Sequence, residues 1–110
     1  MLYIHVVLPS MPLGLVVSEV TNTSARLMWD APMQQGTPAF NFYKLIVEPV
    51  PSSHVAFQAV SVTRNTDVYV SGLMPGTSYI ATVAAVIANN NFPLQEGNAS
   101  VAISFTTHEG

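Results

Sequence analysis

The sequence contains no cysteine and very few charged residues. Its 110 residues include three Lys or Arg and six Asp or Glu, which gives a net charge of −3. Without cysteine, an inter-sheet disulfide and a thiolate metal site are excluded, although the cellular compartment stays open. Arg26, Lys44 and Arg64 are too few to form the basic surface by which proteins bind nucleic acid or anionic membranes. We therefore expect no nucleic-acid partner.

Long apolar runs are also missing. None reaches the length of a membrane span, so we expect no direct membrane insertion in this segment. The first eight residues are apolar, but they lack the basic region of a signal peptide and include His5. We interpret residues 1–11 as a linker or the remnant of a preceding segment, residues 12–107 as one domain, and residues 108–110 as the start of a following linker.

Motifs for catalysis or metal binding are absent as well. His5, His54 and His108 lie far apart, and none has a Cys, His, Asp or Glu at metal-ligand spacing. The sequence has no Gly-rich phosphate loop and no Gly-x-Ser-x-Gly motif. We expect the histidines to be solvated surface residues, and we expect no metal, no cofactor and no enzymatic activity.

What the chain does contain is a series of short apolar runs with a period of two, the pattern of half-buried strands. The run from Ser24 to Trp29 is the clearest, because Ala25, Leu27 and Trp29 fall on one face. Seven strands are predicted in all, at residues 13–20, 24–29, 40–48, 55–62, 67–71, 79–88 and 99–106. Residues 89–98 are expected to form a ten-residue loop.

The alternation also predicts which side chains face the core. These are Leu15, Val17, Val20, Ala25, Leu27, Trp29, Tyr43, Leu45, Val47, Val68, Val70, Leu73, Tyr79, Ala81, Val83, Val101 and Ile103, with Phe105 continuing the last run.

A turn motif separates the fifth and sixth predicted strands. Pro75-Gly76 is a strong turn signal, because proline presets φ and glycine tolerates a positive φ at the next position. The ring of Tyr79 can be buried while its hydroxyl returns to the turn backbone, which satisfies a polar group that is costly to bury unpaired. On this stretch alone, the motif is either such a tyrosine corner or an ordinary hairpin turn.

Taken together, the motifs resemble a fibronectin type III domain. The resemblance rests on a proline-led first strand, "SARLMWD" ending near Trp29, Tyr43 in the third strand, "SGLMPGTSY" at residues 71–79 and "ISFTT" near the end. It implies an all-β, seven-stranded, immunoglobulin-like sandwich with sheets ABE and C′CFG, and an E–F tyrosine corner. The structural residues that it implies are Trp29, Tyr43, Leu73, Pro75, Gly76 and Tyr79.

Four outward-facing apolar residues form the first candidate for an interaction surface. Phe42 and Ile46 on strand C and Ile80 and Val86 on strand F would share the solvent face of one sheet. Contiguous apolar patches usually mark contacts, and the low charge also makes weak self-association an option. A neighbouring domain or strand C′ covering the patch is the alternative.

The loop between strands F and G supplies a second candidate. Phe92 and Leu94 either form an apolar binding tip or fold down over the end of the sandwich. The integrin-binding tripeptide Arg-Gly-Asp, found in this loop in some members of the family, is absent.

For function, the resemblance implies a non-catalytic interaction or spacer module of a larger extracellular adhesion, receptor or matrix protein, with other protein domains as partners. Two alternatives stay open: an accessory spacer domain of a secreted, for example carbohydrate-active, enzyme, and a module of an intracellular muscle-type array. Asn22 and Asn98 begin N-glycosylation sequons, which are weak support for an extracellular or cell-surface ectodomain.

Overall fold

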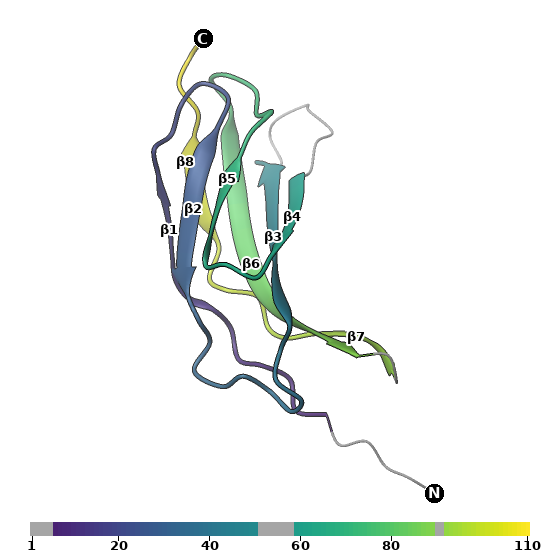
Figure 1. The fold of residues 1–110 in the computed structure, drawn as a ribbon. Coiled ribbons are helices and arrows are strands. Elements are labelled where there is room, and N and C mark those ends of the chain that lie inside the picture. Colours follow the sequence, from purple (N-terminus) through teal and green to yellow (C-terminus); the bar gives the residue numbers. More distant parts are fainter. Residues whose placement is uncertain (1–5, 51–58, 90–91) are drawn as a thin grey trace, which may run out of the picture.

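Two antiparallel sheets face each other in the computed structural model of the chain, which describes residues 6–50, 59–89 and 92–110 (Figure 1). The strands are β1 (Leu13–Ser18), β2 (Ala25–Asp30), β3 (Phe42–Pro49), β4 (Ala59–Thr63), β5 (Asp67–Val70), β6 (Ser78–Asn89), β7 (Phe92–Glu96) and β8 (Ile103–Thr106). Residues 55–58 of the fourth predicted strand lie outside the described residues.

The strand order confirms the predicted sandwich. One sheet has the order β1-β2-β5, and the other has β4-β3-β6-β7 with β8 also paired to β6. These sheets correspond to ABE and C′CFG, with strand G divided into β7 and β8. The described residues therefore form eight strands, one more than the sequence predicted.

Strand G is divided near Ser100, whose side chain takes the hydrogen-bonding position that a backbone carbonyl has in a regular strand pair. The Ser100 N–H donates to the Val83 carbonyl (2.7 Å), and the Ser100 hydroxyl accepts from the Val83 N–H (3.1 Å). A side chain that satisfies the backbone in this way competes with strand pairing. The prediction that Val101 faces the core is consequently wrong: Val101 is 73% exposed.

The predicted ten-residue loop between strands F and G is also wrong. Strand β6 continues to Asn89, and β7 pairs with it in the register Val86↔Glu96 and Ile87↔Gln95. The predicted strand over residues 79–88 therefore ends one residue early, and the predicted loop contains a further strand. Figure 1 shows this β6–β7 arm reaching beyond the ends of β1 and β2.

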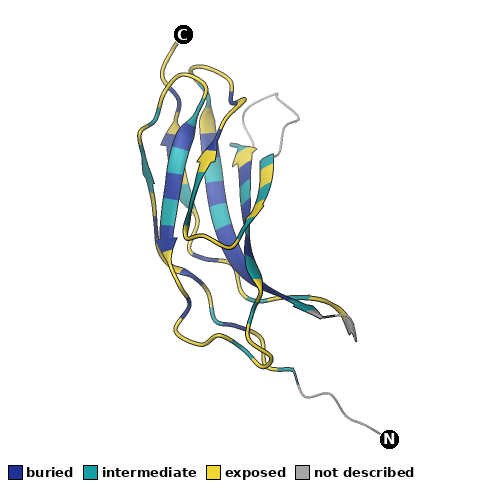
Figure 2. Cartoon of the chain, viewed as in Figure 1, coloured by how far each residue is buried: buried dark blue, intermediate teal, exposed yellow. Residues whose placement is uncertain are grey.

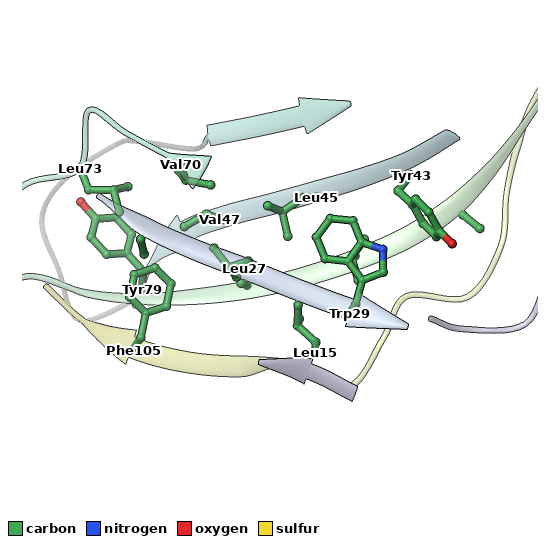
Figure 3. Close-up of a cluster of buried hydrophobic side chains, with 14 residues drawn as sticks. Leu15, Leu27, Trp29, Tyr43, Leu45, Val47, Val70, Leu73, Tyr79 and Phe105 are labelled. Atoms are coloured by element: carbon green, nitrogen blue, oxygen red, sulfur yellow. The ribbon is translucent and has the colours of Figure 1, made fainter. Parts of the chain in front are cut away.

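The inner faces of the two sheets form one core (Figures 2 and 3). Trp29 packs edge-on against Tyr43, with ring centroids 5.4 Å apart, and Phe105 stacks on Tyr79 at 5.7 Å. The buried cluster is Leu15, Ala25, Leu27, Trp29, Tyr43, Leu45, Val47, Val70, Leu73, Tyr79, Ala81, Val83, Ala85 and Phe105. Val17, Val20, Val68 and Ile103, which the alternation also placed inward, are half-buried against it.

The turn between β5 and β6 is a tyrosine corner. The Tyr79 side chain is fully buried, and its hydroxyl accepts a hydrogen bond of 2.9 Å from the Met74 N–H. Gly76 has a φ of +60°, which glycine adopts without strain. The buried Thr107 hydroxyl donates to the Met74 carbonyl (2.6 Å) and accepts from the Thr77 N–H (3.0 Å), so the end of the chain is joined to the corner.

The segment before β1 lies against the loop between β2 and β3. Val7 and Thr37 exchange two backbone hydrogen bonds, of 3.0 and 2.8 Å, and Pro9 is fully buried. A Cβ at Gly97 would approach the Pro9 carbonyl oxygen to 2.5 Å, so this close approach requires glycine. The boundary of the domain at residue 12 stays a prediction.

The two ends of the described chain lie at opposite ends of the molecule (Figure 1). The principal extents are 58 × 25 × 19 Å, so the chain enters at one end of an elongated body and leaves at the other.

Candidate interaction surface

The outward face of the larger sheet holds the patch that the sequence predicted. In the register of β3 and β6, Phe42 lies opposite Val86, and Glu48 lies opposite Ile80. Phe42, Ile80 and the neighbouring Ile46 are half-buried. The alternation placed Phe42, Ile46 and Ile80 on one face of the sheet. The sequence predicted that they are open to solvent, whereas in the structure each is half-buried.

Val86 does not contribute to the exposed surface, because it is only 2% exposed. Its neighbours across the sheet are Phe42 on one side and Glu96 of β7 on the other. The Lys44 Nζ lies 2.7 Å from the Glu96 Oε2, so this ion pair crosses β6 beside Val86. The sequence could not show this cover, because Glu96 was expected in a loop.

Two residues that the sequence reasoning missed extend the same face. Val60 and Val62 of β4 lie opposite Ile46 and Lys44 of β3 and are 52% and 61% exposed. Their period-two spacing was visible in the sequence, but the pairing of β4 with β3 was needed to place them beside the patch. We call Val60, Val62, Ile46, Phe42 and Ile80 the outer patch.

The second candidate, the tip between strands F and G, is described only in part. Leu94 is 65% exposed on β7, and Pro93 beside it is exposed as well. The side chain of Phe92 lies outside the described residues. The apolar binding tip thus stays a prediction.

The opposite face of the sandwich holds a polar cluster that sequence reasoning also missed. Arg26 of β2 pairs with Asp67 of β5 (Nη2 to Oδ2, 2.8 Å), and its guanidinium lies 5.6 Å from the ring centroid of Tyr69. The Tyr69 hydroxyl donates to the Glu19 carboxylate. Register alone brings these residues together, because Arg26 lies opposite Tyr69.

Mutual pairing shifts the titration of this cluster. The hydrogen bond that Arg26 donates to Asp67 raises the pKa of Arg26, and the hydrogen bond that Tyr69 donates to Glu19 raises the pKa of Tyr69. Arg26 therefore stays charged and Tyr69 stays neutral over the physiological range. Since these side chains satisfy one another, the cluster joins β2 and β5 to Glu19, the residue that follows β1.

The described surface also has depressions, of which two are partly open to solvent. One, of about 470 Å³, follows the outer face of the smaller sheet and is lined by Arg26, Met28, Asp30 and Asp67 among others. The other, of about 240 Å³, lies between the start of β1 and the segment before β8 and is mostly apolar. Both depressions are partly open to solvent, whereas binding sites for small molecules typically enclose most of the ligand.

The part of the chain that the structure describes holds no cluster of metal-ligating side chains. Within it, no three His, Cys, Asp or Glu residues lie close enough to hold a metal ion. His108 is exposed, and its backbone N–H donates to the Thr21 carbonyl (3.0 Å). His5 and His54 lie outside the described residues, so their solvation stays a prediction.

The two sequon asparagines are both on the surface. Asn22 lies in the turn between β1 and β2, and Asn98 lies in the segment between β7 and β8; both are exposed. Their glycosylation stays a prediction. Over residues 6–50, 59–89 and 92–110, no helix is long and apolar enough to cross a membrane.

Fold and surface together define an immunoglobulin-like β-sandwich module with a tyrosine corner. Its sequence matches the fibronectin type III domain family over residues 10–97, and the chain belongs to this family. Among curated proteins it is 33% identical to chitinase Chi52 of Paenibacillus xylanexedens over 103 residues, which are 93% of this chain and 17% of the chitinase. The chain thus spans about a sixth of the length of that relative.

Solved structures resemble the fold closely. The FN5 domain of Drosophila Lar superposes with a TM-score of 0.70 at 20% identity, covering 93% of this chain and 99% of that domain. A structure of titin domains gives a TM-score of 0.65 at 25% identity and covers 93% of this chain and 33% of the titin chain. These comparisons agree on the sandwich and differ in the proteins that carry it.

Proposed function

We propose that this chain is a non-catalytic spacer module in a longer, chitin-degrading enzyme. The observation that carries the proposal is the 33% identity to chitinase Chi52 over 93% of this chain. Because only 17% of the chitinase is matched, the hydrolytic activity would reside in other parts of the polypeptide. Of the functions expected from the sequence, this is the accessory spacer domain of a carbohydrate-active enzyme.

The shape of the molecule supports a spacer role. The described ends lie at opposite ends of the 58 Å long axis, so a domain attached at either end would be held apart from the other (Figure 1). The Thr107 hydrogen bonds anchor the last strand at the tyrosine corner, and the Val7–Thr37 pair anchors the first segment. Both described ends of the chain are thereby fixed to the body of the sandwich. The distance between domains attached at these ends would be better defined than with a flexible linker.

The surface supports a module without its own chemistry. The acidic and basic groups of the Arg26 cluster are paired with one another, and the two depressions are partly open to solvent. Chitin is an insoluble polymer, so an enzyme that degrades it works where the polymer is, outside the cell. We therefore propose an extracellular location for the chain.

A module of an adhesion protein or of a tandem array would use the same geometry. The 25% identity to titin domains fits an array, while the likeness to Lar at 20% identity concerns the fold alone. The sequence of the complete gene distinguishes a spacer of an enzyme from a module of an adhesion protein or of a tandem array. A glycoside hydrolase domain in the same polypeptide is the expected result, and tandem immunoglobulin-like or kinase domains would contradict the proposal.

The non-catalytic part of the proposal has its own test. The purified 110-residue chain is incubated with chitin and with soluble chitin oligomers, and released sugar is measured. We expect release no faster than in a sample of heat-denatured chain. Multiple turnovers per chain would overturn this part, whatever the neighbouring domains are.

A further inference from the structure

Strand β4 is an unprotected edge of the larger sheet. It pairs with β3 along one side, and no other described strand pairs with it. An edge strand presents unpaired N–H and C=O groups on which another strand can form. Proteins normally blunt such edges with charge, proline, bulges or very short strands.

The other edges in the described structure carry these protections. Strand β1 has a register shift between Leu13 and Val16, and β7 contains Pro93 and Glu96. Strands β5 and β8 are only four residues long. Strand β4 has the sequence Ala-Val-Ser-Val-Thr, without charge, proline or register shift.

Hydrogen bonds along β3 show which groups of β4 are free. The Val50 N–H donates to the Ser78 carbonyl (3.0 Å), so this pair is bonded toward β6. Bonded and non-bonded pairs alternate in an antiparallel ladder, so Lys44 and Ile46 also bond toward β6. The intervening residues of β3 bond toward β4, through Ala59, Ser61 and Thr63. The pairs bonded between β3 and β4 are thus Tyr43 with Thr63, Leu45 with Ser61, and Val47 with Ala59.

It follows that Val60 and Val62 direct their N–H and C=O groups away from β3. Their side chains are the exposed valines of the outer patch, 52% and 61% accessible. The sequence is symmetric about Ser61, with one valine on each side. A strand of this kind is complementary to an antiparallel copy of itself.

We propose that two copies of this chain associate through β4, antiparallel, with the two Ser61 residues facing each other across a two-fold axis. Val60 of each copy then lies opposite Val62 of the other, and each such pair exchanges two backbone hydrogen bonds. A two-fold interface of this type uses the same surface on both copies and closes on itself. The inference does not depend on the proposed chitin-related function.

The side chains fit this arrangement. Pairing brings four valines together beside Ile46 of each copy, so the two outer patches become continuous across the junction. Lys44, the charged residue opposite Val62, has its amine 2.7 Å from Glu96 on the far side of β6. The Lys44 charge is therefore held away from the junction, where it would otherwise repel its counterpart.

Sedimentation equilibrium of the 110-residue chain tests the association. We expect the mass to rise from 11.8 kDa toward twice that value with increasing concentration. Val62→Lys places a charge on the edge and should weaken association about tenfold or more. Val16→Lys is the matched control, because Val16 is an exposed valine (48%) on the other sheet and should leave association unchanged. A chain that stays monomeric up to a concentration of about 1 mM overturns the proposal, because the dissociation constant would then be weaker than about 1 mM.

Cysteine cross-linking tests the register. The chain has no cysteine, so a single Ser61→Cys gives an unambiguous product. Directly opposed residues in a non-bonded pair have Cα atoms about 4.5 Å apart, which suits a disulfide. Thr63→Cys, on the same face of β4, would be about 13 Å from its counterpart.

We expect oxidation to convert Ser61→Cys to a covalent dimer at least about tenfold faster than Thr63→Cys, with both variants showing the circular dichroism of the parent chain. Equal rates, or faster cross-linking of Thr63→Cys, would overturn the proposed register. Association that Val62→Lys and Val16→Lys weaken equally would place the contact elsewhere and overturn the proposal. Binding of β4 to a different protein, without self-association of this chain, would also overturn the proposal.

Discussion

The Met74 N–H donates a hydrogen bond of 2.9 Å to the hydroxyl of Tyr79, five residues later in the chain. The Tyr79 ring is fully buried and stacks on Phe105 of β8. One side chain thus fills the core and closes the turn that leads into the longest strand of the fold (Figure 3).

Removing this hydroxyl should destabilise the domain without emptying the core. Tyr79→Phe keeps the ring and leaves the part-buried Met74 N–H without its partner, so we expect a loss of about 1 to 2 kcal/mol of unfolding free energy. Urea titration followed by circular dichroism measures it. Tyr69→Phe is the control, because the exposed Tyr69 hydroxyl contacts Glu19 at the surface and should matter by about 0.5 kcal/mol or less. Equal effects of the two changes would contradict the role of the corner.

Thr107 should be sensitive in the same way. Its buried hydroxyl bonds both the Met74 carbonyl and the Thr77 N–H, and Thr107→Val keeps the shape while removing both bonds. We expect a loss of about 1 to 3 kcal/mol in thermal or urea unfolding. The neighbouring Thr106→Val is the control, because Thr106 is exposed and bonds only the exposed Ser78 hydroxyl among the described contacts. If Thr106→Val costs as much as Thr107→Val, the chain end is not anchored as described.

The central tryptophan should tolerate a smaller ring better than its loss. Trp29 is 4% exposed, and its indole N–H is buried without a hydrogen-bond partner among the described residues. Trp29→Ala should cost about 3 to 5 kcal/mol through the cavity it leaves. Trp29→Phe removes less volume and also the unpaired N–H, so it should cost clearly less. Urea titration of both variants decides this, and a loss below about 1 kcal/mol for Trp29→Ala would remove Trp29 from the core.

Stability should fall at high pH because of Tyr43. Burial raises the pKa of the Tyr43 phenol above its ordinary value of about 10. The folded state therefore holds this proton more tightly than the unfolded chain, and the associated stability is complete below about pH 10 and is lost as pH rises through the raised value. Tyr43→Phe should show a smaller loss of unfolding free energy as the pH rises above about 10, measured by urea titration at several pH values. An unchanged loss would contradict the assignment to Tyr43.

The sequence was sufficient for the architecture because the signals there are local. Alternation placed Leu27 and Leu45 inward, and the turn residues around Pro75 marked the corner. The alternation gave the wrong side for Val101. There the Ser100 hydroxyl accepts a hydrogen bond from the Val83 N–H of β6, and a side chain that replaces a backbone partner in this way depends on a strand distant in the sequence. The prediction also failed between Asn89 and Glu96, where asparagines suggested a loop but β6 and β7 pair.

The surface was harder to predict than the core, for a physical reason. Exposure on a sheet face depends on residues from neighbouring strands, and strand register is not a local property. Val86 was assigned to the correct face, yet it is buried beside the Lys44–Glu96 pair. The Arg26–Asp67 pair joins residues 41 positions apart, so only the register of β2 and β5 reveals it.

The most direct test of the spacer function uses the complete protein that carries this chain, which we propose to be a chitin-degrading enzyme. Residues 12–107 are deleted, or replaced by an unrelated fibronectin type III domain, and the turnover of insoluble chitin and of soluble oligomers is compared. We predict that deletion lowers turnover of the insoluble polymer alone and that the replacement restores it, because length and rigidity are what the module supplies. Loss of turnover on soluble oligomers, or failure of the replacement to restore the polymer activity, would contradict the account.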